Sequence, residues 1–251
     1  MTSAARLVII KRLVFTKVMD LNINILEFDS IDSTNTYARK NAGSLPLPSL
    51  IIAREQTAGR GRHGKSFYSP KGTGIYFTLL FEAGGGSEHI TPAAAVAVCE
   101  CIEESTGIHT DIKWVNDIYL GGRKIAGILC EKFESAGKTL IAAGIGINAT
   151  TEAFPADIPL AGSLGVSPDP KETALKTAVK ILEYDLRGDP VKLLAEYRSR
   201  MFILGKEIEY IKDGKIFKGK ALDINPDFTL EIETGAGTES LSSGEISLIM
   251  R

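Results

Sequence analysis

The hydrophobic pattern along the chain alternates between strand-like and helix-like segments up to about residue 203. Short, nearly continuous apolar runs predict buried strands, whereas longer segments with capping residues at their ends predict helices. The predicted strands span residues 23–28, 50–53, 75–81 and 139–148. The predicted helices run from Ser33 to Gly43, from Thr91-Pro92 to Gly107, from Lys171 to Arg187, and from Asp189-Pro190 to about Met201. We therefore expect a mixed α/β domain.

A hairpin is predicted between the second and third of these helices. The segments DIKWVNDIYL (111–120) and KIAGILCEKF (124–133) are rich in apolar residues and flank Gly121 and Gly122. Two consecutive glycines are a strong signal for a tight turn between antiparallel strands. We expect the two segments to pair through that turn.

The pattern changes after Leu204, where short β runs follow one another closely. Turn signals separate them, namely Asp213-Gly214, Asn225-Pro226 and residues 235–237. Closely spaced short strands are typical of a small barrel or roll. We therefore divide the chain into an N-terminal extension (1–22), a mixed α/β domain (23–203) and a small β domain (204–251).

Composition narrows the class of protein further. The chain has 251 residues, of which 44% are hydrophobic and 24% charged, as in an ordinary globular protein. Its formal net charge is -2, which argues against a protein-wide nucleic-acid surface, so an anion site must be a local cluster of positive charge. The apolar runs before residue 20 are interrupted by basic residues, so we expect neither a signal peptide nor a membrane span.

The three cysteines favour a reducing compartment, and we expect a cytoplasmic protein. Cys99, Cys101 and Cys130 are too few for a disulfide framework. Cys99 and Cys101 lie in the Ala-rich predicted helix, where residues two apart point to different faces. This spacing argues against a metal site at that pair.

One glycine-rich loop carries the most distinctive chemistry. From Gly59 the chain reads G-R-G-R-H-G-K-S, which matches the Walker A pattern of P-loop nucleotide-binding proteins. A working P-loop leads into a helix whose N-terminus holds the phosphates. Here Pro70, Gly72 and Gly74 follow, which would interrupt any helix. The sequence therefore disfavours a P-loop.

The same loop still predicts a polyanion site. Four basic side chains, Arg60, Arg62, His63 and Lys65, are interspersed with glycines. Arginine presents planar, permanently charged forks that suit carboxylates and phosphates, and glycine lets the backbone approach a ligand. The alternative is a solvated basic turn, but mutual repulsion among four basic groups argues against a purely structural loop.

Four stretches, read in chain order, resemble biotin protein ligases. They are DSTNTYA (32–38), AREQTAGRGRHGK (53–65), KWVNDIYLGGRKIAGIL (113–129) and GIGIN (144–148), and the likeness extends from Phe28 to Leu248. The resemblance implies an α+β fold with a mixed-sheet catalytic domain of the class II synthetase type, followed by an SH3-like β barrel. It also implies that the catalytic domain binds biotin and ATP.

This resemblance implies a two-step reaction. Biotin and Mg²⁺-ATP would form biotinyl-5′-AMP and pyrophosphate, and a lysine of a biotin carboxyl carrier protein would then accept the biotin. No side-chain nucleophile is needed, because the biotin carboxylate attacks the α-phosphate. Since these two groups repel each other, positive side chains at their junction are the expected catalytic device.

Individual roles also follow from the resemblance. The expected catalytic residues are Lys124, between the biotin carboxylate and the α-phosphate, with Arg60 and Arg62. The expected biotin-binding residues are Ser33, Thr34, Asn35, Gln56, Gly59, Arg60, Gly61, Arg62, Lys124 and Gly127. The expected nucleotide-binding residues are Arg62, Phe67, Lys113, Asn116 and Asn148, with Asp117 as a candidate Mg²⁺ ligand. The loop from Thr57 to Lys65 should be mobile without ligand and should close over the adenylate.

The chain departs from the family pattern at three positions in its motifs. Phe67 stands where tryptophan is common, Val115 where proline is common, and His63 where arginine is frequent. Phenylalanine offers adenine a smaller aromatic face, so nucleotide affinity could be weaker. The proline-to-valine change loosens one backbone restriction, and His63 makes one loop charge pH-dependent.

Two alternatives remain, a lipoate ligase and a non-enzymatic nucleic-acid-binding module. A lipoate ligase has the same fold class, but the Gly59–Arg62 sequence favours biotin. The net charge argues against the nucleic-acid module. Only about thirty residues precede the Ser33–Asn35 segment, so we expect a ligase without repressor function. The resemblance favours a homodimer.

Overall fold

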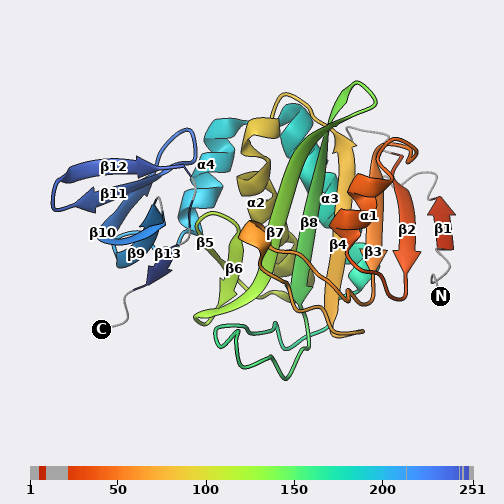
Figure 1. Cartoon of the computed structure of the whole chain (residues 1–251), viewed down its shortest axis with the longest axis horizontal. Coiled ribbons are helices and arrows are strands. Elements are labelled where there is room, and N and C mark those ends of the chain that lie inside the picture. Colours follow the sequence, from red (N-terminus) through yellow and green to blue (C-terminus); the bar gives the residue numbers. More distant parts are fainter. Residues whose placement is uncertain (1–5, 10–21, 213, 243, 245, 249–251) are drawn as a thin grey trace.

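The computed structural model describes residues 6–9, 22–212, 214–242, 244 and 246–248. Within these residues the chain forms a large eight-stranded sheet flanked by helices and a small five-stranded sheet at one side (Figure 1). The strands of the large sheet are β1 (Arg6–Ile9), β2 (Asn24–Phe28), β3 (Ser49–Ala53), β4 (Gly74–Glu82), β5 (Asp111–Lys113), β6 (Asp117–Leu120), β7 (Arg123–Ser135) and β8 (Lys138–Asn148).

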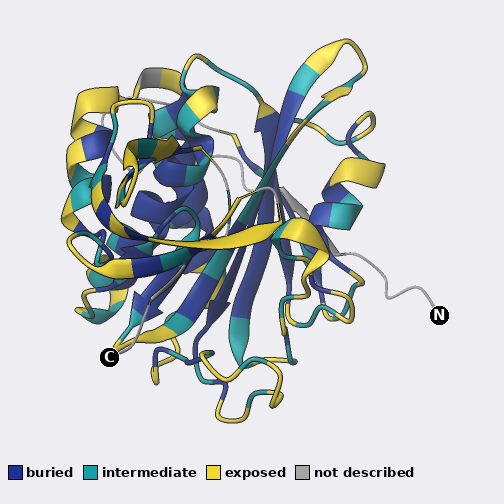
Figure 2. Cartoon of the chain, turned by 60° about the vertical axis from the view of Figure 1, so that its left-hand side comes forward, coloured by how far each residue is buried: buried dark blue, intermediate teal, exposed yellow. Residues whose placement is uncertain are grey.

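Neighbouring strands of the large sheet are antiparallel except for β2 and β3, and the order is β1-β2-β3-β4-β8-β7-β6-β5. The helices are α1 (Thr34–Lys40), α2 (Ile90–Thr106), α3 (Pro170–Arg187) and α4 (Pro190–Ser199). Helices α2 and α3 pack on one face of the sheet and α1 on the other, so the central strands are buried (Figure 2).

Side chains of the central strands alternate between two hydrophobic clusters. On β3, Leu50 and Ile52 pack toward α2 and α3, while Ile51 and Ala53 pack toward α1. This alternation follows from the two-residue period of a strand that is covered on both faces. It also explains why the predicted strands appear as continuous apolar runs in the sequence.

The small sheet has the order β12-β11-β10-β9-β13. Its strands are β9 (Glu207–Lys212), β10 (Lys215–Ile224), β11 (Leu230–Thr234), β12 (Gly237–Leu241) and β13 (Ile246–Leu248). The Trp114 indole N–H donates to the carbonyl of Phe228 at 3.1 Å, which joins the two sheets. The predicted α+β class with a small C-terminal β unit is therefore confirmed.

The predicted continuous strand over residues 111–120 is wrong. The chain folds back at Trp114–Asn116, so that β5 and β6 pair with each other as an antiparallel hairpin. The Asn116 side chain donates to the carbonyl of Ile128 at 2.7 Å, and the Trp114 ring is buried. These long-range contacts fix the turn, and an apolar pattern contains no sign of them. The Trp114–Val115 peptide bond is cis.

The predicted turn at Gly121 and Gly122 is confirmed, with φ values of 56° and 78° that favour glycine. Helix α2 begins at Ile90, after a 3₁₀ turn at Ser87–His89, rather than at Thr91-Pro92. Pro92 lies within the first helical turn, where its missing N–H has no partner to lose.

The predicted N-terminal extension lies outside the described residues except for residues 6–9 and 22. Residues 6–9 form β1, which pairs with β2 and was not expected from the sequence. No helix in the described part of the chain is long and apolar enough to cross a membrane.

Candidate active site

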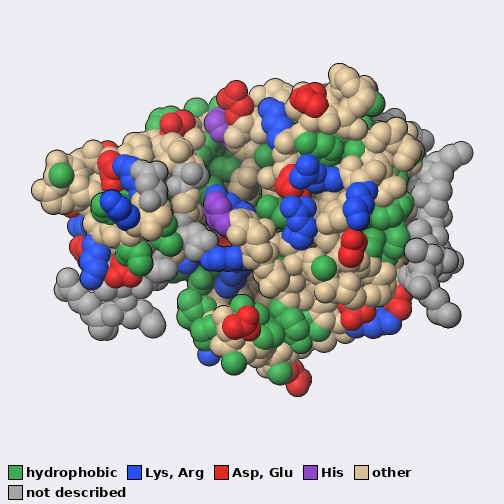
Figure 3. Space-filling model, viewed as in Figure 1, with side chains coloured by type: hydrophobic (Ala, Val, Ile, Leu, Met, Phe, Trp, Pro, Cys, Tyr) green, Lys and Arg blue, Asp and Glu red, His purple; other side chains and the backbone are tan. Residues whose placement is uncertain are grey.

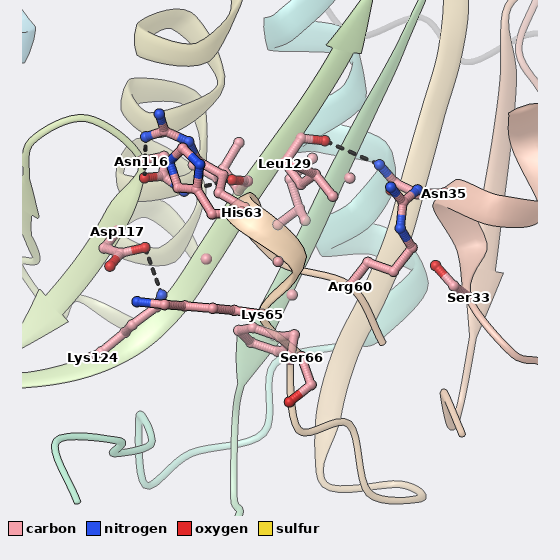
Figure 4. A pocket seen from close by; sticks show the side chains of 18 of the residues that line it. Ser33, Asn35, Arg60, His63, Lys65, Ser66, Asn116, Asp117, Lys124 and Leu129 are labelled. Atoms are coloured by element: carbon pink, nitrogen blue, oxygen red, sulfur yellow. Dashed lines mark hydrogen bonds and ion pairs between the residues drawn. The ribbon is translucent and has the colours of Figure 1, made fainter. Parts of the chain in front are cut away.

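A pocket of about 310 Å³ lies where β7 and β8 meet the glycine-rich loop. Glycines from β7 and β8 form part of its floor, and Gly244 and Ile246 add a contribution from the C-terminal part of the chain. Lys and Arg side chains gather on this face of the molecule (Figure 3). The pocket has two chemically different walls (Figure 4).

The first wall presents the neutral polar side chains of Thr34, Asn35 and Gln56 to the pocket. We call these three residues, together with the buried Thr78 that supports them from behind, the amide wall. Ser33 caps α1, which places Thr34 and Asn35 at the start of the helix beside the pocket. The Thr34 amide donates to Gln56 Oε1 at 2.9 Å. The Thr78 hydroxyl, which lies just beneath, is 2.6 Å from Asn35 Oδ1 and 2.8 Å from Thr34 Oγ1. These bonds fix the orientation of each group before a ligand binds.

Glu131 of β7 connects the amide wall to the glycine-rich loop. Its carboxylate accepts a two-pronged contact from Arg60, at 2.9 and 3.1 Å, and a bond from Arg39 at 2.6 Å. The Asn35 side-chain amide donates to the same carboxylate at 3.1 Å. Burial favours a higher pKa for Glu131, but the hydrogen bonds from Asn35, Arg60 and Arg39 outweigh it and lower the pKa. The carboxylate is therefore charged at neutral pH.

The second wall is rich in positive charge, and we call Arg62, Lys65, Lys113 and Lys124 the cationic wall. Lys124 Nζ lies 2.6 Å from Asp117 Oδ1. The backbone of Lys124 is fixed on its other side, because its N–H donates to the carbonyl of Leu160 at 2.8 Å. Among the described residues that line the pocket, Asp117 is the only acidic one, so the wall carries a net positive charge.

Arg60 and Arg62 diverge although they are two residues apart. Arg60 extends toward Asn35 and Glu131, whereas Arg62 donates to Asn116 Oδ1 at 3.2 Å beside the cationic wall (Figure 4). The resemblance to biotin protein ligases implies that both arginines face the reacting carboxylate and phosphates. In this structure only Arg62 lies with the cationic wall.

Two glycines of β8 let side chains approach the strand closely. A Cβ atom at Gly146 would lie 2.4 Å from Cε1 of Phe67, and one at Gly144 would lie 1.8 Å from Oδ1 of Asn35. Both distances are far below van der Waals contact. Gly144 thus makes room for the amide wall, and Gly146 makes room for the predicted adenine-facing ring.

The predicted residues mostly come together in this pocket, but two do not line it. Gly59 lies within the loop, where a Cβ atom would be 2.4 Å from the carbonyl oxygen of Phe67. Asn148 donates to the carbonyl of Gly162 at 2.9 Å, and its buried Oδ1 has no hydrogen-bond partner among the described residues. The lining includes these predicted residues: Ser33, Thr34, Asn35, Gln56, Arg60, Gly61, Arg62, Phe67, Lys113, Asn116, Asp117, Lys124 and Gly127.

The loop does not have P-loop geometry. Residues Arg62–Gly64 form a 3₁₀ turn, and isolated bridges join Arg60 to Ser66 and Gln56 to Ser69. The chain then enters β4 rather than a helix. The phosphate-binding helix that a P-loop requires does not follow this loop.

Comparison with known proteins agrees with this architecture. Residues 27–148 match the biotin/lipoate A/B protein ligase family, and residues 203–249 match the biotin protein ligase C-terminal domain. A Bacillus subtilis protein named bifunctional ligase/repressor BirA is 32% identical over 242 residues, which cover 90% of this chain and 74% of that protein. The biotin–[acetyl-CoA-carboxylase] ligase of Paracoccus denitrificans is 39% identical over 123 residues, covering 47% of this chain and 51% of that protein.

A solved structure gives the same result. The biotin protein ligase from Aquifex aeolicus in complex with biotin and ATP superposes with a TM-score of 0.76 at 27% identity, covering 90% of this chain and 99% of that one. Fold and pocket thus define the class as that of the biotin/lipoate ligases. Within that class, the chain belongs to the biotin protein ligase family, which confirms the resemblance stated from its motifs.

Proposed function

We propose that this protein activates biotin with ATP to form biotinyl-5′-AMP and then transfers biotin to a lysine of a biotin carboxyl carrier protein domain. The observation that carries the proposal is a single pocket with a neutral amide wall and a cationic wall. Biotin has a neutral ureido ring and a carboxylate tail, and ATP is a polyanion. The two walls match the two substrates.

The amide wall supports a role in binding the ureido ring. Thr34 and Gln56 present hydroxyl and amide groups whose positions are fixed by hydrogen bonds to each other. Preformed neutral donors and acceptors suit a neutral ligand, because no charge has to be desolvated. With the ring held there, the carboxylate of biotin would extend toward Lys124.

The cationic wall supports a role in the first chemical step. A biotin carboxylate oxygen attacks the α-phosphorus of ATP, and the bond to pyrophosphate breaks as the new bond forms. Lys124 and Arg62 would offset the negative charge that both reactants bring together. Phe67 would cover the adenine, and Lys113 and Asn116 would bind the phosphates. Catalysis then rests on position and charge.

Mg²⁺ would enter with ATP rather than reside in the protein. The described residues hold no cluster of three or more acidic, histidine or cysteine side chains suited to a metal. Mg²⁺ in such sites is commonly bound by one or two carboxylates together with substrate phosphates, and Asp117 is a carboxylate at the cationic wall. Bound there, the ion would neutralise part of the phosphate charge.

In the second step the lysine amine of the carrier, after losing its proton, attacks the acyl carbon and AMP leaves. The name of the Paracoccus relative supports a carrier that belongs to acetyl-CoA carboxylase. We place this reaction in the cytoplasm, where biotin, ATP and such a carrier would meet. The homodimer expected from the family remains a prediction, which light scattering would test.

Pyrophosphate release tests the proposal directly. The assay would supply Mg²⁺-ATP with biotin, with lipoate or with no acid, for the wild-type protein and for Lys124→Ala. We expect biotin-dependent release that falls roughly 100- to 1,000-fold in the variant, the usual effect of removing one stabilising donor. Lys138→Ala is the matched control, because Lys138 pairs with Glu82 on the exposed surface. Release that depends on lipoate, or on neither acid, would overturn the proposal.

A further inference from the structure

Two arginines of the glycine-rich loop contact opposite walls of the pocket. Arg62 contacts Asn116 through one hydrogen bond of 3.2 Å, whereas Arg60 contacts Glu131 through two bonds of 2.9 and 3.1 Å. Backbone bonds such as Phe67 N–H to Gly59 C=O shape the loop internally. Backbone bonds from Thr57 and Ala58 to Ile31 and Asp32 hold the start of the loop. Of the two arginine contacts nearer its tip, the one with Glu131 is charged and bidentate.

We propose that Glu131 is a positioning residue that anchors Arg60 and thereby holds the loop of residues 57–66 closed over the pocket. Glu131 would control how long biotin and its adenylate stay bound, and Arg60 would act through this contact rather than on the reacting carboxylate. The retention of the adenylate rests on the function proposed above. The loop contact itself does not.

The surroundings of Glu131 suit an anchor. Its side chain is only 15% exposed and lies on β7, a strand paired along its length with β8. A bidentate arginine–carboxylate pair has a fixed geometry, unlike most exposed ion pairs, so it specifies where Arg60 lies. Because the carboxylate of this pair is mostly buried on a strand of the sheet, it can hold Arg60 in a defined position above the pocket.

Glu131 also joins the loop to the amide wall. Its carboxylate binds Asn35 at 3.1 Å, and Asn35 in turn donates to the carbonyl of Leu129 and lies 2.6 Å from the hydroxyl of Thr78. Arg39 of α1 supplies a second positive charge to the same carboxylate. One carboxylate thus links the loop, α1 and the wall that would hold the biotin ring. An ordinary surface ion pair would not link three parts of the site in this way.

The test uses Glu131→Gln, which keeps the shape of the side chain and removes its charge. In the protein without ligand, we expect amide hydrogen exchange of residues 57–66 to become several-fold faster. We expect the KM for biotin to rise about tenfold with kcat within about twofold, the size of effect that charged hydrogen bonds commonly have. Biotinyl-5′-AMP should dissociate faster by a similar factor, measured by chase with unlabelled biotin.

The matched control is Glu82→Gln, since Glu82 also forms an ion pair, with Lys138, but lies on the exposed surface outside the pocket. Arg60→Gln tests the contact from the loop side, where the hydrophobic core is untouched. Combined with Glu131→Gln it should add almost nothing to the biotin KM, because both changes remove one contact. Arg62→Gln alters a different contact, so its effect on the KM for biotin should multiply with the effect of Glu131→Gln.

Two results would overturn the proposed role of Glu131. One is a Glu131→Gln protein whose loop exchange and biotin KM equal those of the wild type. The other is a double variant, Arg60→Gln with Glu131→Gln, whose KM for biotin rises by the full product of the two single effects. If the wild type releases no biotin-dependent pyrophosphate, the proposed function fails instead, and the exchange measurement still decides whether Glu131 holds the loop.

Discussion

The two walls of the pocket differ in how their polar groups are balanced. In the amide wall, neutral side chains bind one another, and the adjoining carboxylate of Glu131 is fully engaged by Arg39, Arg60 and Asn35. In the cationic wall, as far as the described residues go, positive side chains outnumber carboxylates, of which Asp117 is one. The first wall is complete without a ligand, whereas the second gains from an incoming anion.

This difference separates two ways of recognising a substrate. A balanced wall selects by shape and by the positions of its hydrogen bonds, and a mismatch leaves a buried group without a partner. A charged wall attracts any polyanion and stabilises the charge that develops during reaction. Changes to the amide wall should therefore act on biotin, and changes to the cationic wall should act on ATP.

We expect the largest effects on KM from Gly144→Ala and Gly146→Ala, which test whether the two walls bind different substrates. Both replace a glycine on the same face of β8, but the new Cβ would meet Asn35 Oδ1 at 1.8 Å in the first and Phe67 Cε1 at 2.4 Å in the second. We expect Gly144→Ala to raise the KM for biotin roughly 10- to 100-fold, because Asn35 must leave its partners. Gly146→Ala should raise the KM for ATP roughly tenfold, because Phe67 is displaced.

Steady-state kinetics with each substrate varied in turn would measure both constants. Gly235→Ala is the control, since a Cβ atom there meets nothing within 4 Å and the residue lies in the turn between β11 and β12. If both pocket variants changed the two constants alike, the walls would not act separately.

Thr78→Val tests the amide wall alone, and we expect a smaller effect than from the glycine variants. The side chain is fully buried, and valine keeps its shape but leaves Asn35 and Thr34 without the hydroxyl. A buried group that loses a partner costs roughly 1–3 kcal/mol. Thr34 and Asn35 keep other hydrogen bonds, so we expect the lower end of this range, which raises the KM for biotin roughly 5- to 10-fold and leaves the KM for ATP unchanged. Thr139→Val is the control, because that hydroxyl bonds Glu134 on the exposed surface. A rise in the KM for ATP alone would contradict the assignment of Thr78 to the amide wall.

The sequence pointed to most of both walls, because the family motifs gave Thr34, Asn35 and Gln56, and the glycine-rich loop and the hairpin gave the cationic residues. Arg62, Lys65 and Lys124 are adjacent to glycines or turns, and positive charge in a glycine-rich loop has few structural uses. Thr78 and Glu131, by contrast, are ordinary residues in strand-like runs, and their roles arise from partners 43 to 96 residues away. Local patterns contain no information about such partners, so neither residue could be found.

The fold shows the same limit. The strands, most helices and the Gly121-Gly122 turn follow from local periodicity and turn chemistry. The fold-back at Trp114–Asn116 does not, because contacts of Asn116 with Ile128 and of Trp114 with Phe228 determine it. Long-range contacts therefore determine where this part of the cationic wall lies. The sequence predicted which residues belong to it but not their positions in space.

A change in ionic strength should have the smallest effect on the two KM values, but it tests both walls at once. Salt screens exposed charges over about 8 Å at 0.15 M, and the cationic wall acts through net charge. Raising potassium chloride from about 0.05 to about 0.3 M should increase the KM for ATP by roughly threefold and that for biotin by less than twofold. Arg62→Gln should reduce the salt dependence for ATP, whereas Thr78→Val should not, because its wall is already balanced. Equal salt dependence for the two substrates would show that charge does not distinguish the walls, and recognition of ATP would then have to rest on shape, as for biotin.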